Sequence, residues 1–497
     1  MKFKMKKTKA IHIGIIILGI IFISISSFHS NVWFDESYSV ALCEHSFKEI
    51  WQIGGNDVHP VLYYMLLHIL YLIFGSNMIV YRLFSVLGIA LIGILGYTHI
   101  RKDFGEKTGI IFSYLSFFMP VMCVYATEIR MYSLAALFAI LTAIYAYRIL
   151  KRNSKKNWIL FGVSSLALSY THYYGLMTAG IINLALFIFS IYKRKEDKNY
   201  LKYFLIQAIA EIILYVPWLI YFITQLKHVG GGFWIKLKFP DTLIEVLSFQ
   251  YRGLMDSGIH FNLETILPFA FCVIIYAYIG YLIYKQIKQK NDIKAGVLAF
   301  GVYIAVIVAA LIISKFMPIL YSRYIFVITS ILIFALAFFM STEKRKYITI
   351  ILLALMGIMS IYNEYKISKV DYAPSNMEQV KYLKDNINEN DIIIYSDVIT
   401  NSGASIYFKN NKQYFLNLEN WGVEEAYKAF LPAMETTRNF DFLNNYKGRI
   451  WILDNNEQTL FNKLKEQGYD LTILNENKKI ETKYHNYIYN IMLVEIM

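Results

Sequence analysis

The chain has 497 residues, of which 57% are hydrophobic and only 17% are charged. A soluble protein of this length needs more charge to cover its surface, so the composition excludes an ordinary soluble enzyme. The net charge is +13, but the basic residues form short clusters between apolar segments, a pattern typical of membrane topology rather than of nucleic-acid binding.

The first apolar segment follows a lysine-rich start. Residues Lys2 to Lys9 precede an apolar run from Ile11 to Phe28. This run is long for the hydrophobic part of a cleaved signal peptide, and no small-residue cleavage site follows it. The pattern predicts an uncleaved first membrane span that starts in the cytoplasm and ends near Ser30.

Further apolar segments alternate with basic clusters, which mark the cytoplasmic side of a membrane. Because the chain must cross an even number of times between two such clusters, we expect about eleven α-helical spans, with a cytoplasmic N-terminus and an outer C-terminus. Residues 61–74 are apolar but too short to span, so they predict a helix along the outer interface. After the first span, the predicted spans are 77–99, two within 108–149, two within 158–192, 201–223, 264–284, 295–314, 321–340 and 347–363.

The character of the chain changes near residue 366. Residues 377–383 predict a helix, whereas 391–397, 449–454 and 489–496 predict strands. Alternating strands and helices are typical of a small α/β or α+β domain. We therefore expect two domains. Residues 1–365 form a transmembrane catalytic domain that includes a first outer loop at 29–75, and residues 366–497 form a soluble domain outside the membrane.

Two adjacent carboxylates, Asp35 and Glu36, follow the first span. At the membrane edge they could supply a general base and an orienting or electrostatic partner. Adjacent residues on a regular element point apart, so separate roles are expected. The alternative is that Asp35 caps the following helix, residues 37–43, and that both carboxylates are simply solvated.

A polar turn at 54–60 reads Gly-Gly-Asn-Asp-Val-His-Pro and includes Asp57 and His59. His59 could contact a phosphate or hold a carboxylate. The alternative is a loop histidine beside a proline that starts a helix.

Further polar residues lie where predicted spans meet on the outer side. Glu128, Arg130 and Tyr132 join two spans, and an ionisable pair at such depth is costly unless it serves a site, although the two charges could simply neutralise one another. His172 lies in the next outer turn, where aromatic belts also gather histidine. Arg323 starts a late span and could bind a phosphate or extend toward lipid headgroups.

Five short segments follow one another between about residues 30 and 225: WFDESYSVAL, DVHPVLYYMLLH, YRLFS, YATEIRMYSL and THYYG. This series resembles bacterial GT-C glycosyltransferases, specifically glycosyltransferase family 39, with protein O-mannosyltransferases and lipid A aminoarabinose transferases as distant relatives. SRYIF at 322–326 fits the late span of that family. The resemblance implies a polyprenyl-phosphate-linked sugar as donor and an inverting transfer outside the membrane.

The resemblance also implies roles for single residues. Asp35 falls on the acidic position of the family's first loop, the usual candidate for the general base, and Glu36 completes the pair. His59-Pro60 corresponds to a Lys-Pro in the aminoarabinose transferases, where the lysine meets the lipid phosphate. Arg130 and Tyr132 match an Arg-x-Tyr of the family. The candidates for binding donor phosphate or sugar are then Asp57, His59, Glu128, Arg130, Tyr132, His172 and Arg323.

Together these observations predict a hexosyl- or pentosyltransferase of the bacterial cell membrane, with a cell-envelope glycan, a lipid or an exported protein as acceptor. No cofactor is expected, because the three cysteines lack CxxC spacing and no cluster of metal ligands occurs, although a divalent cation between Asp35 and phosphate stays open. The alternatives are a transporter or flippase of lipid-linked saccharides and a non-catalytic scaffold. Transporters carry ionisable residues at mid-membrane, whereas here they fall in outer loops.

Overall fold

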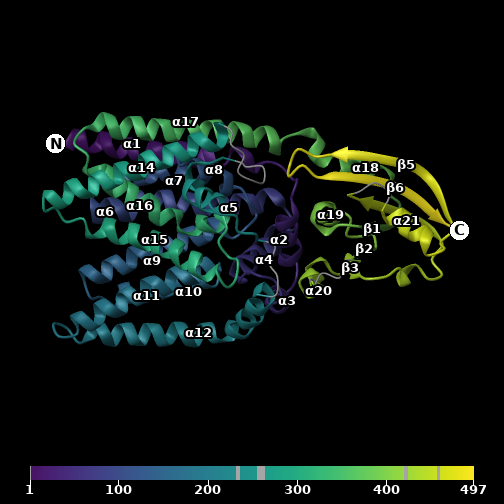
Figure 1. Cartoon of the computed structure of the whole chain (residues 1–497), viewed down its shortest axis with the longest axis horizontal. Helices are drawn as coiled ribbons and strands as arrows, with labels where there is room; N and C mark the ends of the chain where they lie inside the picture. Colours follow the sequence, from purple (N-terminus) through teal and green to yellow (C-terminus); the bar gives the residue numbers. More distant parts are fainter. Residues whose placement is uncertain (1, 231–234, 254–262, 419–421, 423, 456–458) are drawn as a thin grey trace. The chain divides into compact units, whose positions relative to one another are not determined.

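The computed structural model describes residues 2–230, 235–253, 263–418, 422, 424–455 and 459–497. Their contacts define two compact units, each assembled from separate stretches of the chain, and Figure 1 labels the elements of both. The first unit comprises Met1–Ser27, Val58–Tyr63 and Arg82–Lys366, and the second comprises Phe28–Asp57, Tyr64–Tyr81 and Ile367–Met497.

Long apolar helices build the first unit. Within the described ranges, nine helices are long and apolar enough to cross a membrane, or ten if a pair bent by 57° counts as one span. The chain is therefore a multi-pass membrane protein. The α-helices that lie wholly or mostly in this unit, short ones included, are α1 (Lys2–Ile23), α5 (Met78–Leu95), α6 (Arg101–Phe104), α7 (Glu106–Phe118), α8 (Pro120–Ala126), α9 (Tyr132–Lys151), α10 (Lys155–Ser169), α11 (Tyr173–Lys193), α12 (Asn199–Gly230), α13 (Asp241–Ser248), α14 (Leu263–Lys288), α15 (Lys294–Ile313), α16 (Phe326–Thr342) and α17 (Lys346–Asp371).

The count of nine or ten is lower than the eleven spans predicted, because α10 is too short and because the bent pair α7 and α8 is included only if it is one span. Helix α10 has 15 residues, which at 1.5 Å per residue reach about 22 Å, less than the ~30 Å hydrocarbon core. The predicted division of 108–149 is confirmed, because α9 follows the bent pair α7 and α8. Pro120 starts α8, consistent with a proline that cannot continue the helix before it.

Close packing of the helices defines the interior of the first unit. α16 packs against α7, α9 and α15, and Ser330 Oγ donates a hydrogen bond to the Ala136 carbonyl at 2.7 Å. The turn Ile25–Ser27, which follows the N-terminal α1, contacts α17, because Ser26 Oγ donates to the Glu364 carboxylate at 2.7 Å (Figure 1 shows α1 and α17). A Cβ at Gly96 would meet Ser113 Oγ at 2.1 Å, so a small residue is required for this approach.

Short helices of the first outer loop contribute to the second unit. They are α2 (Phe34–Cys43), α3 (Phe47–Gly54) and most of α4 (Leu62–Phe74). The helix predicted after Pro60 is confirmed as α4, whose 13 residues are too few to span a membrane. α3 begins with a capping box, in which Ser46 and Glu49 satisfy each other's backbone N–H groups.

A six-stranded sheet with four flanking helices makes up most of the rest of the second unit, and its strand order is β3-β2-β1-β4-β6-β5. β6 is antiparallel to both of its neighbours, β4 and β5, whereas the other neighbouring strands pair in parallel. The predicted C-terminal domain of strands and helices is confirmed. The strands are β1 (Ile392–Tyr395), β2 (Gln413–Leu416), β3 (Met434–Thr437), β4 (Gly448–Asp454), β5 (Leu471–Glu481) and β6 (Ile488–Ile496). The α-helices of this domain are α18 (Glu378–Asn386), α19 (Val398–Ser405), α20 (Glu424–Tyr427) and α21 (Thr459–Glu466).

The central strand β1 carries the core of this sheet. Ile394 pairs with Tyr414 on β2 and with Ile452 on β4. Ile394 and Ile452 pack against Leu460 and Leu464 of α21, which therefore cover one face. The chain leaves β1 toward β2 and β3 and then returns to β4 on the other side of β1, so the strand order reverses between β1 and β4.

Candidate functional site

The predicted site residues divide between the two units. The first unit holds His59, Glu128, Arg130, Tyr132, His172 and Arg323, whereas the second holds Asp35, Glu36 and Asp57. In the first unit three of these six residues lie at the starts of helices. Tyr132 begins α9, His172 is the N-cap residue of α11, and Arg323 lies in the turn Ser322–Ile325 that leads into α16. Helix N-termini carry partial positive charge and favour anions.

Hydrogen bonds fix the loops that carry these residues. Arg82 Nη1 donates to the Thr127 carbonyl at 2.9 Å, and Ser85 Oγ donates to the Glu128 carbonyl at 2.5 Å. Near His59, the Leu62 N–H donates to the Tyr170 carbonyl at 3.1 Å, which joins the turn before α4 to the turn before α11.

The rings of the first unit form one cluster around His172. Its ring centroid lies 5.1 Å from that of His59, 5.7 Å from that of Tyr132 and 5.1 Å from that of Tyr324. Tyr324 also contacts His59, at 5.9 Å. The structure therefore brings together three of the predicted residues and adds Tyr324, which sequence reasoning missed. We call His59, Arg130, Tyr132, His172, Arg323 and Tyr324 the histidine cluster.

Hydrogen bonding identifies the protonation state of His172. Its Nδ1 accepts from the Tyr174 N–H at 3.0 Å, so the proton of the neutral ring lies on Nε2. Burial, together with the positive charge of Arg130, lowers the pKa of His172 to about 3. Nε2 is buried and has no hydrogen-bond partner among the residues that the structure describes. His172 therefore offers a neutral N–H donor to a ligand.

His59 and the arginines complete the electrostatics of the cluster. Burial, followed by the positive charges of Arg130 and Arg323, lowers the pKa of His59 well below its ordinary value. His59 is thus neutral at pH 7 as well, and the positive charge resides on the arginines. Arg130 is only 4% exposed. Buried guanidinium groups beside neutral N–H donors can bind an oxyanion through charge-assisted hydrogen bonds.

The histidine cluster predicts acid sensitivity of the fold. An unfolded histidine has a pKa of about 6.5, above the folded value for His172, so the unfolded chain binds more protons between the two values. Stability should therefore be full above pH 6.5 and fall as the pH drops from about 6.5 toward 3, by up to ~1.4 kcal/mol per pH unit for one such group. When the pH is lowered from 7 to 5, the Tm of His172→Phe should fall by less than the Tm of the wild type. Equal losses in both proteins would contradict a buried neutral His172.

A further buried arginine of the same unit, in addition to Arg82 and Arg130, was missed by sequence reasoning. Arg252 follows the turn Phe249–Tyr251 and is 2% exposed. None of its three guanidinium nitrogens hydrogen-bonds to any residue in the described part of the chain. A buried cation without such partners is costly, and an anionic ligand would relieve that cost. An arginine between two apolar segments was the only sequence signal available.

In the second unit, the two adjacent carboxylates have different surroundings. α2 begins at Phe34 with Trp33 as its N-cap residue, so the alternative that Asp35 caps a helix at 37–43 is wrong. Glu36 takes that role, because its carboxylate accepts from the Trp33 N–H at 3.4 Å. Glu36 is fully buried and also accepts from Tyr484 Oη at 3.0 Å, whereas Asp35 is half-buried.

The C-terminal sheet holds this part of the first loop in place. His485 stacks on Trp33 at 4.4 Å between centroids, and Tyr487 Oη accepts from the Phe34 N–H at 3.3 Å. Ser37 Oγ donates to Ser402 Oγ at 2.9 Å on α19. Asp35 therefore lies on a helix that the C-terminal domain orients from several sides.

We predict that the contact between Tyr484 and Glu36 stabilises the loop. Tyr484→Phe removes a donor to a fully buried carboxylate, which should lower the free energy of unfolding by about 1–3 kcal/mol. Thermal unfolding measures this loss. Tyr347→Phe is the matched control, because Tyr347 is 60% exposed and its replacement should change stability by less than ~0.5 kcal/mol. Equal Tm values for the two variants would contradict the prediction.

Two tyrosines of the second unit are influenced by the charge of Asp35 and by those of two further aspartates. Burial raises the pKa of Tyr427, and the charges of Asp397, Asp57 and Asp35 raise it further. Burial likewise raises the pKa of Tyr487, on which Asp35 and Asp397 also act. Asp35, Asp57 and Asp397, the last from the C-terminal domain, are thus all near enough to Tyr427 for their charges to act on it. Asp397 could have been noticed because it follows the buried strand β1, whereas nothing in the sequence distinguished Tyr427.

Within the described ranges, no three His, Cys, Asp or Glu side chains are placed to hold a metal ion. The three cysteines, Cys43, Cys123 and Cys272, are buried and not bonded to one another.

Part of the chain is similar to a known protein family. Residues 58–221 match the family model described as dolichyl-phosphate-mannose-protein mannosyltransferase. The matched segment contains His59, Arg130 and His172, but neither Asp35 nor Arg323. No curated protein sequence matches the chain.

The fold is similar to that of solved membrane glycosyltransferases of the GT-C class. ArnT from Cupriavidus metallidurans in the apo state superposes with a TM-score of 0.64 at 9% identity, over 99% of this chain and 98% of that one. ArnT from the same organism bound to undecaprenyl phosphate gives 0.60 at 9% identity, over 98% and 97%. The resemblance inferred from the sequence is confirmed, and the chain has the GT-C fold.

Proposed function

We propose that the protein is an inverting glycosyltransferase that moves a sugar from a polyprenyl-phosphate donor to an acceptor hydroxyl or amine on the outer face of the membrane. The observation that carries this proposal is the histidine cluster. Two neutral histidines and the charges of Arg130 and Arg323 converge where apolar helices begin. Such a site suits a phosphate attached to a long apolar chain.

The donor side is supported by chemistry and by fold. Arg130 and Arg323 provide charge, His172 Nε2 provides an N–H donor, and Arg252 provides a further buried guanidinium group. These groups would stabilise the phosphate as it leaves the anomeric carbon. The structure of ArnT with undecaprenyl phosphate supports a lipid phosphate as the ligand of this fold.

The acceptor side of the reaction needs a base. In the proposed step an acceptor oxygen or nitrogen attacks the anomeric carbon, the bond from that carbon to the phosphate oxygen breaks, and the polyprenyl phosphate leaves with the electron pair. The proton of the acceptor passes to the Asp35 carboxylate. Glu36 acts as the orienting partner, because its carboxylate is already hydrogen-bonded at the start of α2. Asp57 and Glu128 are proposed to contact the donor sugar.

Charge asymmetry supports the orientation in a bacterial cell membrane. We propose that residues 1–365 form the catalytic membrane domain with a cytoplasmic N-terminus, and that residues 366–497 lie outside. The basic clusters assigned to the cytoplasm are Lys2 to Lys9, Arg101 to Lys107, Arg148 to Lys156, Lys193 to Lys202, Lys285 to Lys294 and Lys344 to Lys346.

Lipid binding tests the proposed donor class directly. The purified chain should bind undecaprenyl phosphate at least about 100-fold more tightly than undecaprenol, because only the phosphate engages the cations and N–H donors. Titration in detergent followed by native mass spectrometry gives both affinities. Equal affinities would show that the apolar chain alone is recognised and would overturn the donor assignment.

A further inference from the structure

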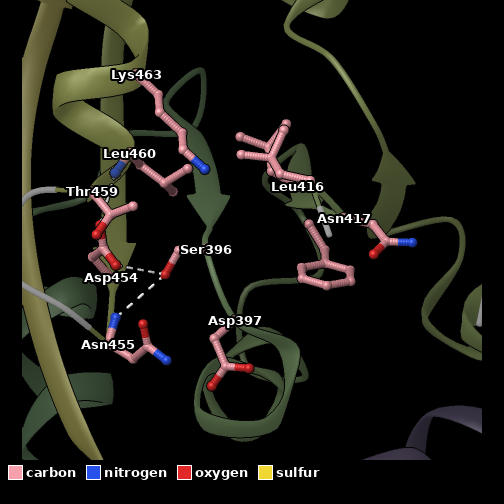
Figure 2. A pocket seen from close by; sticks show the side chains of 11 residues that line it. Ser396, Asp397, Leu416, Asn417, Asp454, Asn455, Thr459, Leu460 and Lys463 are labelled. Carbon is pink, nitrogen blue, oxygen red and sulfur yellow. Dashed lines mark hydrogen bonds between the residues drawn. The ribbon is translucent and has the colours of Figure 1, made fainter. Parts of the chain in front are cut away.

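A cavity of about 150 Å³ opens in the C-terminal domain, which is part of the second unit. It lies at the carboxyl ends of β1, β2 and β4, and helix α21 forms one side (Figure 2). Its volume is below the ~300–1,000 Å³ of pockets for drug-sized ligands, so it admits about one sugar-sized group. The polar residues that line it include Ser396, Asp397, Asn417, Asn455, Thr459 and Lys463.

The position of the cavity follows from the strand order. The chain leaves β1 toward β2 but leaves β4 toward α21, so the connections diverge between β1 and β4. In open sheets of mainly parallel strands, ligands bind outside the carboxyl ends at the point where the strand order reverses. Ser396 follows β1 and Asn455 follows β4, so both lie at this point.

The carboxylates of the cavity argue against an anionic ligand. Asp454 accepts from Ser396 Oγ at 2.7 Å and from the Leu460 N–H at 2.8 Å, so the N-terminus of α21 already has a carboxylate on it. Asp397 accepts from the Ile399 and Thr400 N–H groups at the start of α19. Two carboxylates beside the cavity would repel a phosphate.

Other groups remain available to a neutral ligand. The side chain of Asn455 and the ammonium of Lys463 form no hydrogen bond or ion pair with any residue in the described ranges. Figure 2 shows Lys463 extending into the cavity from α21, with Asn455 and Asp397 on the opposite side. Amide, ammonium and carboxylate groups together offer donors and acceptors for vicinal hydroxyls, and Phe415 adds an apolar wall.

Aromatic contacts connect the cavity to Asp35 within the second unit. The Phe415 ring lies 5.9 Å from the Tyr427 ring, which in turn lies 6.1 Å from the Phe34 ring. Phe34 is the neighbour of Asp35 in the sequence. The charges of Asp397 and Asp35 both act on Tyr427, so Tyr427 lies between the cavity and the proposed base in this chain of contacts.

We infer that this cavity is the acceptor subsite and that it holds one neutral sugar or polyol unit of a glycan acceptor, bound by Asn455, Lys463 and Asp397. The role of this cavity as an acceptor subsite rests on the proposed glycosyltransferase function, whereas its binding of a neutral sugar does not. The inference selects a glycan over a lipid or a protein as the acceptor.

Saturation-transfer NMR on the full-length protein tests this inference. The probes are the methyl glycosides of glucose, galactose, mannose and N-acetylglucosamine, together with ribitol and inorganic phosphate. At least one neutral probe should bind, and Asn455→Ala and Lys463→Ala should each weaken its binding fivefold or more. Lys465→Ala, an exposed position on the same helix, is the matched control and should bind the probe as the wild type does.

Binding of undecaprenyl phosphate to the same variants shows whether they are folded. It also distinguishes a failure of the subsite inference from a failure of the proposed function. The cavity variants should retain lipid binding, which would show that the fold is intact, and Asn455→Asp should restore part of the sugar binding. The inference is overturned if no neutral probe binds, if the two alanine variants bind it as the wild type does, or if phosphate displaces it. Sugar binding that persists in a protein unable to use any donor would instead sink the proposed function and leave the subsite standing.

Discussion

Asp35→Asn is expected to lower kcat for sugar transfer by about 10²- to 10⁴-fold while changing the donor Kd by less than about threefold. The amide cannot take the acceptor's proton, but it keeps the size of the side chain in the first turn of α2. Asp35 is the half-buried member of the pair, whereas Glu36 is committed to Trp33 and Tyr484. Single-turnover transfer and a separate donor titration measure the two effects.

Two further variants show whether the loss is specific to Asp35. Asp385→Asn makes the same change at an exposed position on α18 and should retain wild-type kcat. Glu36→Gln should lower the Tm more than Asp35→Asn does, because the carboxylate it removes is fully buried and hydrogen-bonded. A kcat for Asp35→Asn within a factor of ten of the wild type would mean that another group is the base.

Arg130→Gln is expected to weaken binding of the polyprenyl-phosphate donor by about 2–4 kcal/mol, or roughly 30- to 1,000-fold. Arg130 is 4% exposed, and its charge acts on both histidines of the cluster. Glutamine retains hydrogen bonding but removes the charge that the leaving phosphate requires. Arg130→Lys restores the charge without the two-pronged geometry, so it should recover only part of the affinity.

The opposite end of the same helix supplies the control for Arg130. Arg152 follows the last residue of α9 and is exposed, so Arg152→Gln should bind donor as the wild type does. The Tm of each variant shows whether a loss of affinity reflects unfolding. Unchanged donor affinity in a folded Arg130→Gln would remove the histidine cluster from the account of phosphate binding.

Apolar length and charge distribution predicted most of the helical fold, because a membrane span needs a long apolar run. They failed at α10, where an apolar run continues through a turn and the helix itself has only 15 residues. In the C-terminal domain, β1, β4 and β6 are buried strands with clear apolar patterns. β2 and β3 are as short as β1 but lack its run of buried isoleucines, and β5 is a largely exposed edge strand rich in Asn and Lys, so no apolar pattern distinguished them.

The residues of the candidate site could be chosen from the sequence, but their grouping could not. Residues from the turns before α4, α9 and α11 meet only because helices pack side by side, and no local pattern encodes that contact. Tyr324 and Tyr427 resemble many other aromatic residues of this chain. Asp397 lies far from Asp35 in the sequence, and only the fold of the second unit brings both to Tyr427.

The most direct test of the central claim is donor turnover by the purified wild-type protein with a panel of polyprenyl-phosphate sugars and a cell-envelope extract as acceptor. We predict that one donor is consumed, that free polyprenyl phosphate accumulates, and that NMR shows the transferred sugar with inverted anomeric configuration. A donor that binds and crosses the bilayer of reconstituted vesicles without cleavage of its sugar–phosphate bond would contradict the account and identify a transporter of lipid-linked saccharides.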